Sequence, residues 1–134
     1  MKTTTKNEVL TEALRYIDNA KEILKTKGKL ENSLYSDKKY VKMAGHTAYT
    51  GILYALDHAN ILPPLAKRTQ RRDVKDYQEA LGKVNKKMLG YYVSCYQQLH
   101  LVAGYDGVGH KEILRISLSD ATELITWASN RARE

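Results

Sequence analysis

The chain has 134 residues, of which 43% are hydrophobic and 28% charged, so we expect one globular domain with its own core and no extensive disorder. No apolar run reaches the roughly 18 to 20 residues of a membrane span, and the polar N-terminus lacks the apolar segment of a secretory signal. The net charge of +7 leaves an acidic partner possible, because segment 61–90 carries eight Lys or Arg against three Asp or Glu.

Cysteine usage indicates a reducing compartment. Cys95 is the only cysteine, which excludes a disulfide within the chain. Together with the absence of a membrane span or secretory signal, this predicts a cytoplasmic protein that does not associate with membranes.

Apolar residues recur at helical spacing in the first half of the chain. The pattern predicts a helix over 7–27, ended by Gly28, and a second helix over 37–60. The inner face of the second helix carries four alanines and Gly51, which would let a neighbouring helix approach closely. The adjacent Pro63 and Pro64 then mark a connecting segment.

The second half of the chain predicts two further helices, over 73–103 and 110–131. A break in the last helix near Ser117 or Ser119 is possible, because Ser119 is followed by acidic residues as at a helix start. No segment alternates with the period of two typical of a half-buried strand. We therefore predict an all-α fold, an antiparallel four-helix up-and-down bundle that forms a single domain over residues 1–134.

Segment 38–56 resembles the second helix of HEPN domains, the nucleotide-binding helical bundles of higher eukaryotes and prokaryotes. Later segments resemble more closely a small uncharacterised bacterial family of HEPN-like bundles; these are YQEAL at 77–81, KKML at 86–89, YQQLHL at 96–101 and GYDG at 104–107. The resemblance implies a HEPN-like four-helix bundle. It implies no particular function, because that family is itself uncharacterised.

Catalytic HEPN ribonucleases carry an Arg and, separated from it by a few residues near the end of the third helix, a His. The positions that would have to be Arg are 93–95 before His100 and 103–105 before His110, and none of them is Arg. His46 and His58 also lack an Arg at that distance. The ribonuclease activity of the family is therefore not expected here.

Polar aromatic residues form stripes on the second and third predicted helices. His46 and Tyr54 lie on the first stripe, and Tyr96 and His100 lie on the second. If both stripes face one groove, they could bind a planar or phosphorylated ligand by stacking and hydrogen bonding. The simpler interpretation, which we favour, is that these are packing residues whose polar tips reach water or the backbone.

A basic cluster precedes and begins the third predicted helix. The residues expected to contact a ligand are Arg68, Arg71, Arg72 and Lys75; the cluster also includes Lys67, and Lys83, Lys86 and Lys87 continue it on the outer face of the helix. Such a cluster could contact the phosphates of a nucleic acid. Acidic residues interrupt it and no aromatic residue lies among its charges, however, so we favour an ordinary solvated surface.

The last predicted helix has a second apolar side, away from its main core-facing line. It consists of Ile113, Ile116, Leu124 and Trp127. An exposed apolar face that carries a Trp is typical of an interaction surface, and we favour that interpretation slightly over a helix buried on two sides.

The sequence shows no set of residues for metal binding or catalysis. It has no HExxH motif, no acidic calcium loop and no phosphate-binding glycine loop, and Cys95 lies on a predicted buried stripe. We expect no catalytic residue, no metal and no cofactor. The leading hypothesis is a protein-interaction module, a homodimer using Ile116 and Trp127; RNA or nucleotide binding is the alternative, and a degenerate ribonuclease comes third.

Overall fold

The computed structural model describes residues 4–67 and 70–132, and this part of the chain is mostly helical, as expected for the all-α class. Its helices are α1 (Lys6–Lys27), α2 (Lys38–Asp57), α3 (Val74–Val84), α4 (Lys86–Cys95), the π-helix η1 (Tyr96–Tyr105) and α5 (Lys111–Ser129). Three two-residue strands are β1 (Leu30–Glu31), β2 (Leu34–Tyr35) and β3 (Gly109–His110). No helix in the described residues combines the length and the apolarity needed to cross a membrane.

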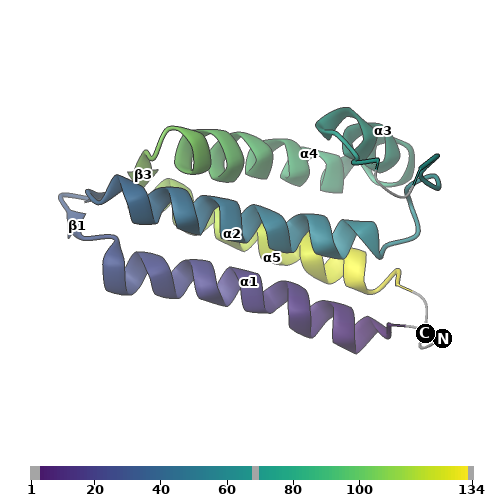
Figure 1. Ribbon diagram of the computed structural model, residues 1–134, viewed down its shortest axis with the longest axis horizontal. Helices are drawn as coiled ribbons and strands as arrows, with labels where there is room; N and C mark the ends of the chain where they lie inside the picture. The colour runs from purple at the N-terminus through teal and green to yellow at the C-terminus, as the bar shows by residue number, and fades with distance from the viewer. Residues whose placement is uncertain (1–3, 68–69, 133–134) are drawn as a thin grey trace.

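The long helices lie side by side and the chain reverses direction between them (Figure 1). Helix α1 runs toward the strands, α2 returns, α4 and η1 run toward the strands again, and α5 returns. Helix α2 packs against α1, η1 and α5, while α5 also packs against α1 and α4. The shorter α3 lies at the end opposite the strands and packs against α4.

Helix α1 has well-defined ends. The Thr5 side chain accepts a hydrogen bond from the Glu8 backbone N–H at 3.2 Å, and the Glu8 carboxylate accepts one from Thr5 N–H at 3.4 Å. Lys25 and Lys27 occupy the last turn, where the helix dipole favours positive charge. The buried face is a stripe at helical spacing, consisting of Val9, Ala13, Ile17, Ala20 and Leu24.

Small residues on α2 allow other helices to approach its backbone, as the sequence predicts. A Cβ atom on Gly45 would lie 2.4 Å from the carbonyl oxygen of Leu99 and 2.7 Å from the amide nitrogen of Gly104. A Cβ atom on Gly51 would lie 2.7 Å from the Cβ of Tyr16. Helix α2 is therefore the central helix, with η1 and α1 in direct backbone contact with its glycines.

The prediction of one continuous helix over 73–103 is wrong. Asn85 has an extended backbone (φ −159°, ψ 103°), and its side-chain oxygen accepts a hydrogen bond from Met88 N–H at 3.2 Å. It thus ends α3 and begins α4. From Tyr96 onward the helix widens into η1, so that Asp106 N–H donates to the carbonyl of Leu101, five residues earlier.

Helix α5, in contrast, is continuous through Ser117 and Ser119. The Ser117 hydroxyl donates to the Ile113 carbonyl at 2.8 Å, within its own helix. The break considered possible from the sequence therefore does not occur.

A small antiparallel sheet, which the sequence did not predict, lies at one end of the helices. Strand β2 pairs with both β1 and β3, with Leu30 opposite Tyr35 and Leu34 opposite His110. The turn between β1 and β2 consists of Asn32 and Ser33, both with positive φ (49° and 72°). The sheet joins the α1–α2 connection to the start of α5.

Candidate functional site

Aromatic rings form a row through the molecule between α3 and the strand end. Tyr77 on α3 lies 5.8 Å from Tyr92 on α4, between ring centroids, and Tyr92 lies 6.5 Å from Tyr96. Tyr96 stacks on His100 at 5.3 Å, and Tyr49 from α2 lies 4.7 Å from His100. The predicted stripe of the third helix thus lies along the contact between α2 and the rod of α4 and η1, where it meets Tyr49, a residue outside the predicted stripe of α2.

The hydroxyls of Tyr49, Tyr77 and Tyr92 in this row are paired inside the protein. The hydroxyl oxygens of Tyr49 and Tyr92 lie 2.7 Å apart and share a hydrogen bond, and the Tyr77 hydroxyl donates to the Asp57 carboxylate at 2.7 Å. Burial raises the pKa of both Tyr92 and Tyr77. The hydrogen bond with Tyr49 raises the pKa of Tyr92 further, and the hydrogen bond with Asp57 does the same for Tyr77. These phenols stay neutral and act as packing residues with satisfied polar tips.

His100 lies at the end of the row near the strands. Burial lowers its pKa, and the neighbouring His46, whose ring centroid lies 5.5 Å away, lowers it further. Within the described residues its buried Nδ1 atom has no hydrogen-bond partner. The exposed His46 lies over Gly104, where a Cβ atom would come within 2.9 Å of its ring.

The structure brings together three of the four predicted ligand-binding residues. His46, Tyr96 and His100 form one cluster, but Tyr54 lies elsewhere. The Tyr54 ring contacts His58 at 4.6 Å and lines a shallow surface between α1 and α2. A single groove lined by both stripes is therefore not formed.

The predicted basic cluster is only partly open to a ligand. Arg72 is half-buried and donates to the Pro63 carbonyl at 2.6 Å, and Lys75 forms an ion pair with Glu79 at 3.8 Å. Arg71 is exposed, whereas Arg68 lies outside the described residues. Two of the four cations thus already have partners within the protein.

Cys95 is fully buried, and its thiol lies 3.5 Å from the Ser117 carbonyl, to which it donates. Burial, with a smaller contribution from Asp120, raises the pKa of this thiol to about 12. The thiolate needed for nucleophilic attack is therefore not formed near neutral pH. Among the described residues, no three His, Cys, Asp or Glu side chains are placed to hold a metal ion.

The outer face of α5 exposes large apolar side chains. Ile113 and Ile116, one turn apart, are 44% and 47% exposed. Trp127 is half-buried further along the helix, with the Arg131 guanidinium 5.4 Å above its ring. Leu124 is fully buried, so its expected place on this face is wrong: it belongs to the core.

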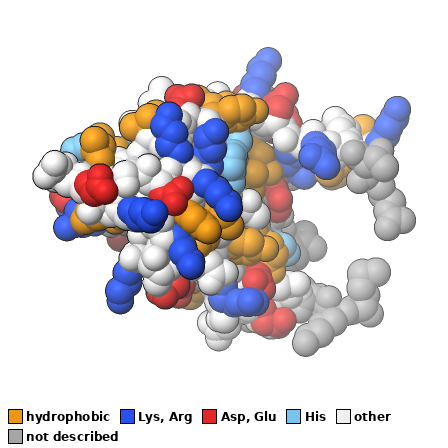
Figure 2. Space-filling view, turned by 60° about the vertical axis from the view of Figure 1, so that its left-hand side comes forward, with side chains coloured by type: hydrophobic (Ala, Val, Ile, Leu, Met, Phe, Trp, Pro, Cys, Tyr) orange, Lys and Arg blue, Asp and Glu red, His pale blue; other side chains and the backbone are white. Residues whose placement is uncertain are grey.

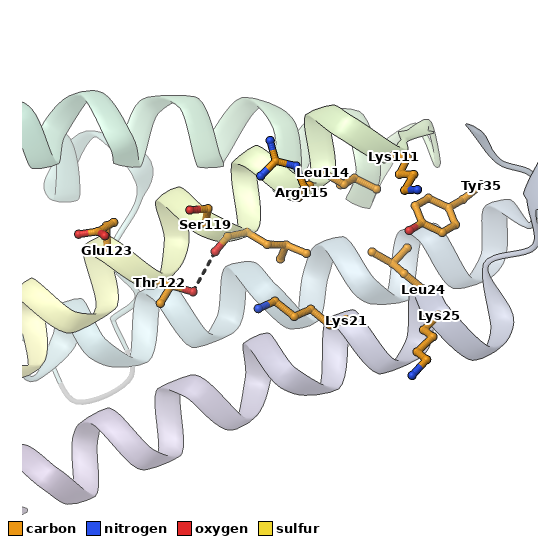
Figure 3. A pocket seen from close by; sticks show the side chains of 11 residues that line it. Lys21, Leu24, Lys25, Tyr35, Lys111, Leu114, Arg115, Ser119, Thr122 and Glu123 are labelled. Carbon is orange, nitrogen blue, oxygen red and sulfur yellow. Dashed lines mark hydrogen bonds between the residues drawn. The ribbon is translucent and has the colours of Figure 1, made fainter. Parts of the chain in front are cut away.

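A groove that the sequence did not predict lies between α1 and α5. It has a volume of about 450 Å³ and lies next to the strands. Figure 2, with the strand end of the molecule turned forward, shows Lys and Arg side chains spread among hydrophobic ones on that end. Figure 3 shows its lining side chains, which come from α1, α5 and β2: Lys21, Leu24, Lys25, Tyr35, Lys111, Leu114, Arg115, Leu118, Ser119, Thr122 and Glu123. The available signal was a basic pair four residues apart on each helix, but one sequence does not show which helices are neighbours.

A protein-family model described as a domain of unknown function, DUF5618, matches residues 8–130. The chain belongs to this family. A solved structure, described as a protein of unknown function from Dyadobacter fermentans, is similar at 46% sequence identity and a TM-score of 0.87. The match covers 95% of this chain and 98% of that one. No curated protein matches this DUF5618 chain.

Proposed function

We propose that this chain is a non-enzymatic interaction module that forms a homodimer through the outer face of α5. The observation that carries the proposal is the exposure of Ile113 and Ile116, which are 44% and 47% exposed on successive turns of one helix. Each leaves apolar area in water that association would remove, at about 25 cal/mol per Å². Trp127 is of the residue type most enriched at binding hot spots.

A two-fold arrangement fits a helix face of this kind. In a symmetric dimer the same surface occurs on both partners. If the two-fold axis is perpendicular to α5, the helix lies antiparallel against its copy. Ile113 and Ile116 lie near one end of α5 and Trp127 near the other. An antiparallel crossing would therefore place the isoleucines of one protomer near the Trp127 of its partner.

The fold assignment beyond its helical class is part of the same proposal. We infer that α1, α2, the rod of α4 and η1, and α5 form an antiparallel four-helix up-and-down bundle of HEPN-like type. Their alternating directions and mutual packing support this. The missing Arg of the HEPN ribonuclease motif and the protonated Cys95 thiol support a role without catalysis, and the single unpaired cysteine supports a cytoplasmic location.

Light scattering after gel filtration tests the homodimer. The native chain of 15.3 kDa should elute with about twice that mass, and Ile113→Lys/Ile116→Lys should convert it to the monomer without loss of helical circular dichroism. Val84→Lys is the matched control, because Val84 is 43% exposed on α3, away from α5, and should leave the dimer intact. A monomeric native chain at about 100 µM would remove the proposal.

The alternative partner is RNA, and the exposed Arg71 is the observation that favours it. RNA binding should weaken steeply with salt, because cationic contacts to phosphates release counterions. Arg71→Glu should then abolish binding, while Ile113→Lys/Ile116→Lys should leave it unchanged. The two experiments together distinguish a nucleic-acid module from a dimer.

A further inference from the structure

The groove between α1 and α5 has an apolar floor that is formed by both helices. Leu24 comes from α1, and Leu114 and Leu118 come from α5. All three are buried core residues, and the groove exposes only their edges. A volume of about 450 Å³ lies within the range of small-molecule sites, which are mostly apolar clefts with a few polar groups at the rim.

The rim of the groove carries four cations, of which Arg115 alone forms an ion pair among the described residues. Arg115 is paired with Glu112 through two hydrogen bonds. In the described residues, Lys21, Lys25 and Lys111 form no ion pair within 4.0 Å. Three ammonium groups therefore surround an apolar floor, a combination that suits a ligand with an anionic head and an apolar body.

The charges are distributed unevenly along the groove. Figure 3 shows Lys111 and Tyr35 at the strand end and Glu123 at the other end. Since the Glu123 carboxylate repels an anion, the head group of such a ligand belongs at the strand end. There the Lys111 ammonium attracts the head group and the Tyr35 hydroxyl can donate a hydrogen bond to it.

We propose that this groove binds a small amphipathic carboxylate, with its head at Lys111 and Tyr35 and its hydrocarbon body over Leu24, Leu114 and Leu118. The positions from 111 to 123 span about 18 Å of helix, which limits the ligand to a short molecule. The groove lies on the side of α5 that faces α1, away from Ile113 and Ile116. Binding of the carboxylate therefore does not depend on the homodimer.

Titration calorimetry and amide NMR with decanoate test the proposal. Decanoate should bind in a saturable manner and shift the amide signals of Leu24, Tyr35, Leu114 and Leu118. Octanoate should bind more weakly, by up to about fourfold for each of the two missing CH₂ groups. Decanol has the same apolar body without the charge and should bind about tenfold more weakly than decanoate.

Charge reversal separates recognition from general attraction to a basic protein. Lys21→Glu/Lys111→Glu should weaken decanoate binding by about tenfold, because two ammonium groups that attract the decanoate carboxylate are replaced by carboxylates that repel it. Lys83→Glu/Lys86→Glu is the control, since it changes the net charge by the same amount at exposed positions outside the groove. The control should bind decanoate within about twofold of the native chain.

Three results would overturn the proposal. The first is decanoate binding without shifts at the groove, and the second is equal loss of binding in both charge variants. The third is an amphipathic Leu/Glu peptide that shifts the groove signals when decanoate does not, which would make the groove a protein-docking surface. Circular dichroism of each variant shows whether a loss of binding comes from unfolding.

Discussion

At the scale of single residues, the protein is built with tyrosine where many cores use phenylalanine. The chain has ten Tyr and no Phe, so each buried aromatic ring brings a hydroxyl that needs a partner. Tyr92 is fully buried and shares its hydrogen bond with Tyr49, while Tyr77 donates to Asp57. The sequence predicted seam residues with satisfied polar tips, but it could not show that the tips would pair with each other.

The Tyr49–Tyr92 pair gives a testable asymmetry. Tyr49→Phe leaves the Tyr92 hydroxyl without its partner in the core, and we expect it to cost about 1 to 3 kcal/mol of unfolding free energy. Tyr49→Phe/Tyr92→Phe removes both polar groups and should cost less than the single change. Urea unfolding measures both values, and a double variant clearly less stable than Tyr49→Phe would contradict this account.

His100 predicts how stability depends on pH. Its pKa in the folded protein lies below its ordinary value of 6.5, mainly because of burial, so the unfolded chain binds a proton more readily. Stability should therefore fall as the pH drops from above 6.5 toward the lowered pKa, and level off below it.

Urea midpoints at about pH 7.5 and about pH 5.5 test this dependence. His100→Gln, which cannot titrate, should lose less stability between the two values than the native chain. His110→Gln is the control, because His110 is exposed and should retain the native pH dependence. Equal pH dependence in His100→Gln and the native chain would exclude His100 as the cause.

At the scale of elements, some helices approach each other closely only because a glycine, which has no Cβ atom, lies at the contact. Gly45 lies against the backbone of η1, whereas Gly90 on α4 has nothing within 4 Å of its missing Cβ atom. The same substitution should therefore have opposite effects at the two positions, because only one of them carries a packing constraint.

Gly90→Ala should stabilise the protein by about 0.5 to 1 kcal/mol, since alanine loses less backbone entropy in a helix. Gly45→Ala should destabilise it by at least about 1 to 3 kcal/mol, because the new atom would lie 2.4 Å from the Leu99 carbonyl and backbone atoms cannot easily move apart. Thermal unfolding of the two variants gives the signs. A stabilised Gly45→Ala protein would show that α2 and η1 are not in backbone contact.

Helical periodicity predicted α1, α2 and α5, because a core-facing apolar stripe runs along each of them. In α5 the start signal at Ser119 competed with this stripe but did not break the helix. Periodicity failed over 73–103, where apolar residues keep helical spacing across Asn85 although that residue caps a new helix. Periodicity also gave no indication of η1. A π-helix differs from an α-helix in that each N–H bonds to the fifth instead of the fourth preceding carbonyl, and no residue type in this segment marks that difference. The strands are too short to alternate, and only Asn32 at the turn hinted at a hairpin.

At the scale of the whole molecule, the candidate surfaces depend on which helices become neighbours. The exposed isoleucines of α5 could be predicted because they lie on one helix. The groove could not, because Leu24 and Leu114 are 90 positions apart and meet only after α1 and α5 pack together. Local patterns thus predict faces, whereas a cavity requires the tertiary arrangement.

The same arrangement predicts how the chain behaves when it is cut. Between α2 and α3 the described residues form no helix or strand, and Lys67 and Arg71 there are exposed. Trypsin should cleave first at these positions, before the lysines within helices, because a protease needs an extended segment. The cut would give one piece with α1 and α2 and another with α3, α4, η1 and α5. These pieces should stay associated, because α2 packs on η1 and α5, and α1 also packs on α5.

Limited trypsin digestion followed by gel filtration tests this expectation. Denaturing electrophoresis should show two fragments, whereas the nicked protein should elute with the intact chain and retain its helical circular dichroism. Separation of the fragments in native buffer would mean that the core shared by α1, α2, η1 and α5 is weaker than its buried residues indicate. A first cut within a helix would show that the connecting segment is protected by a contact with the rest of the protein.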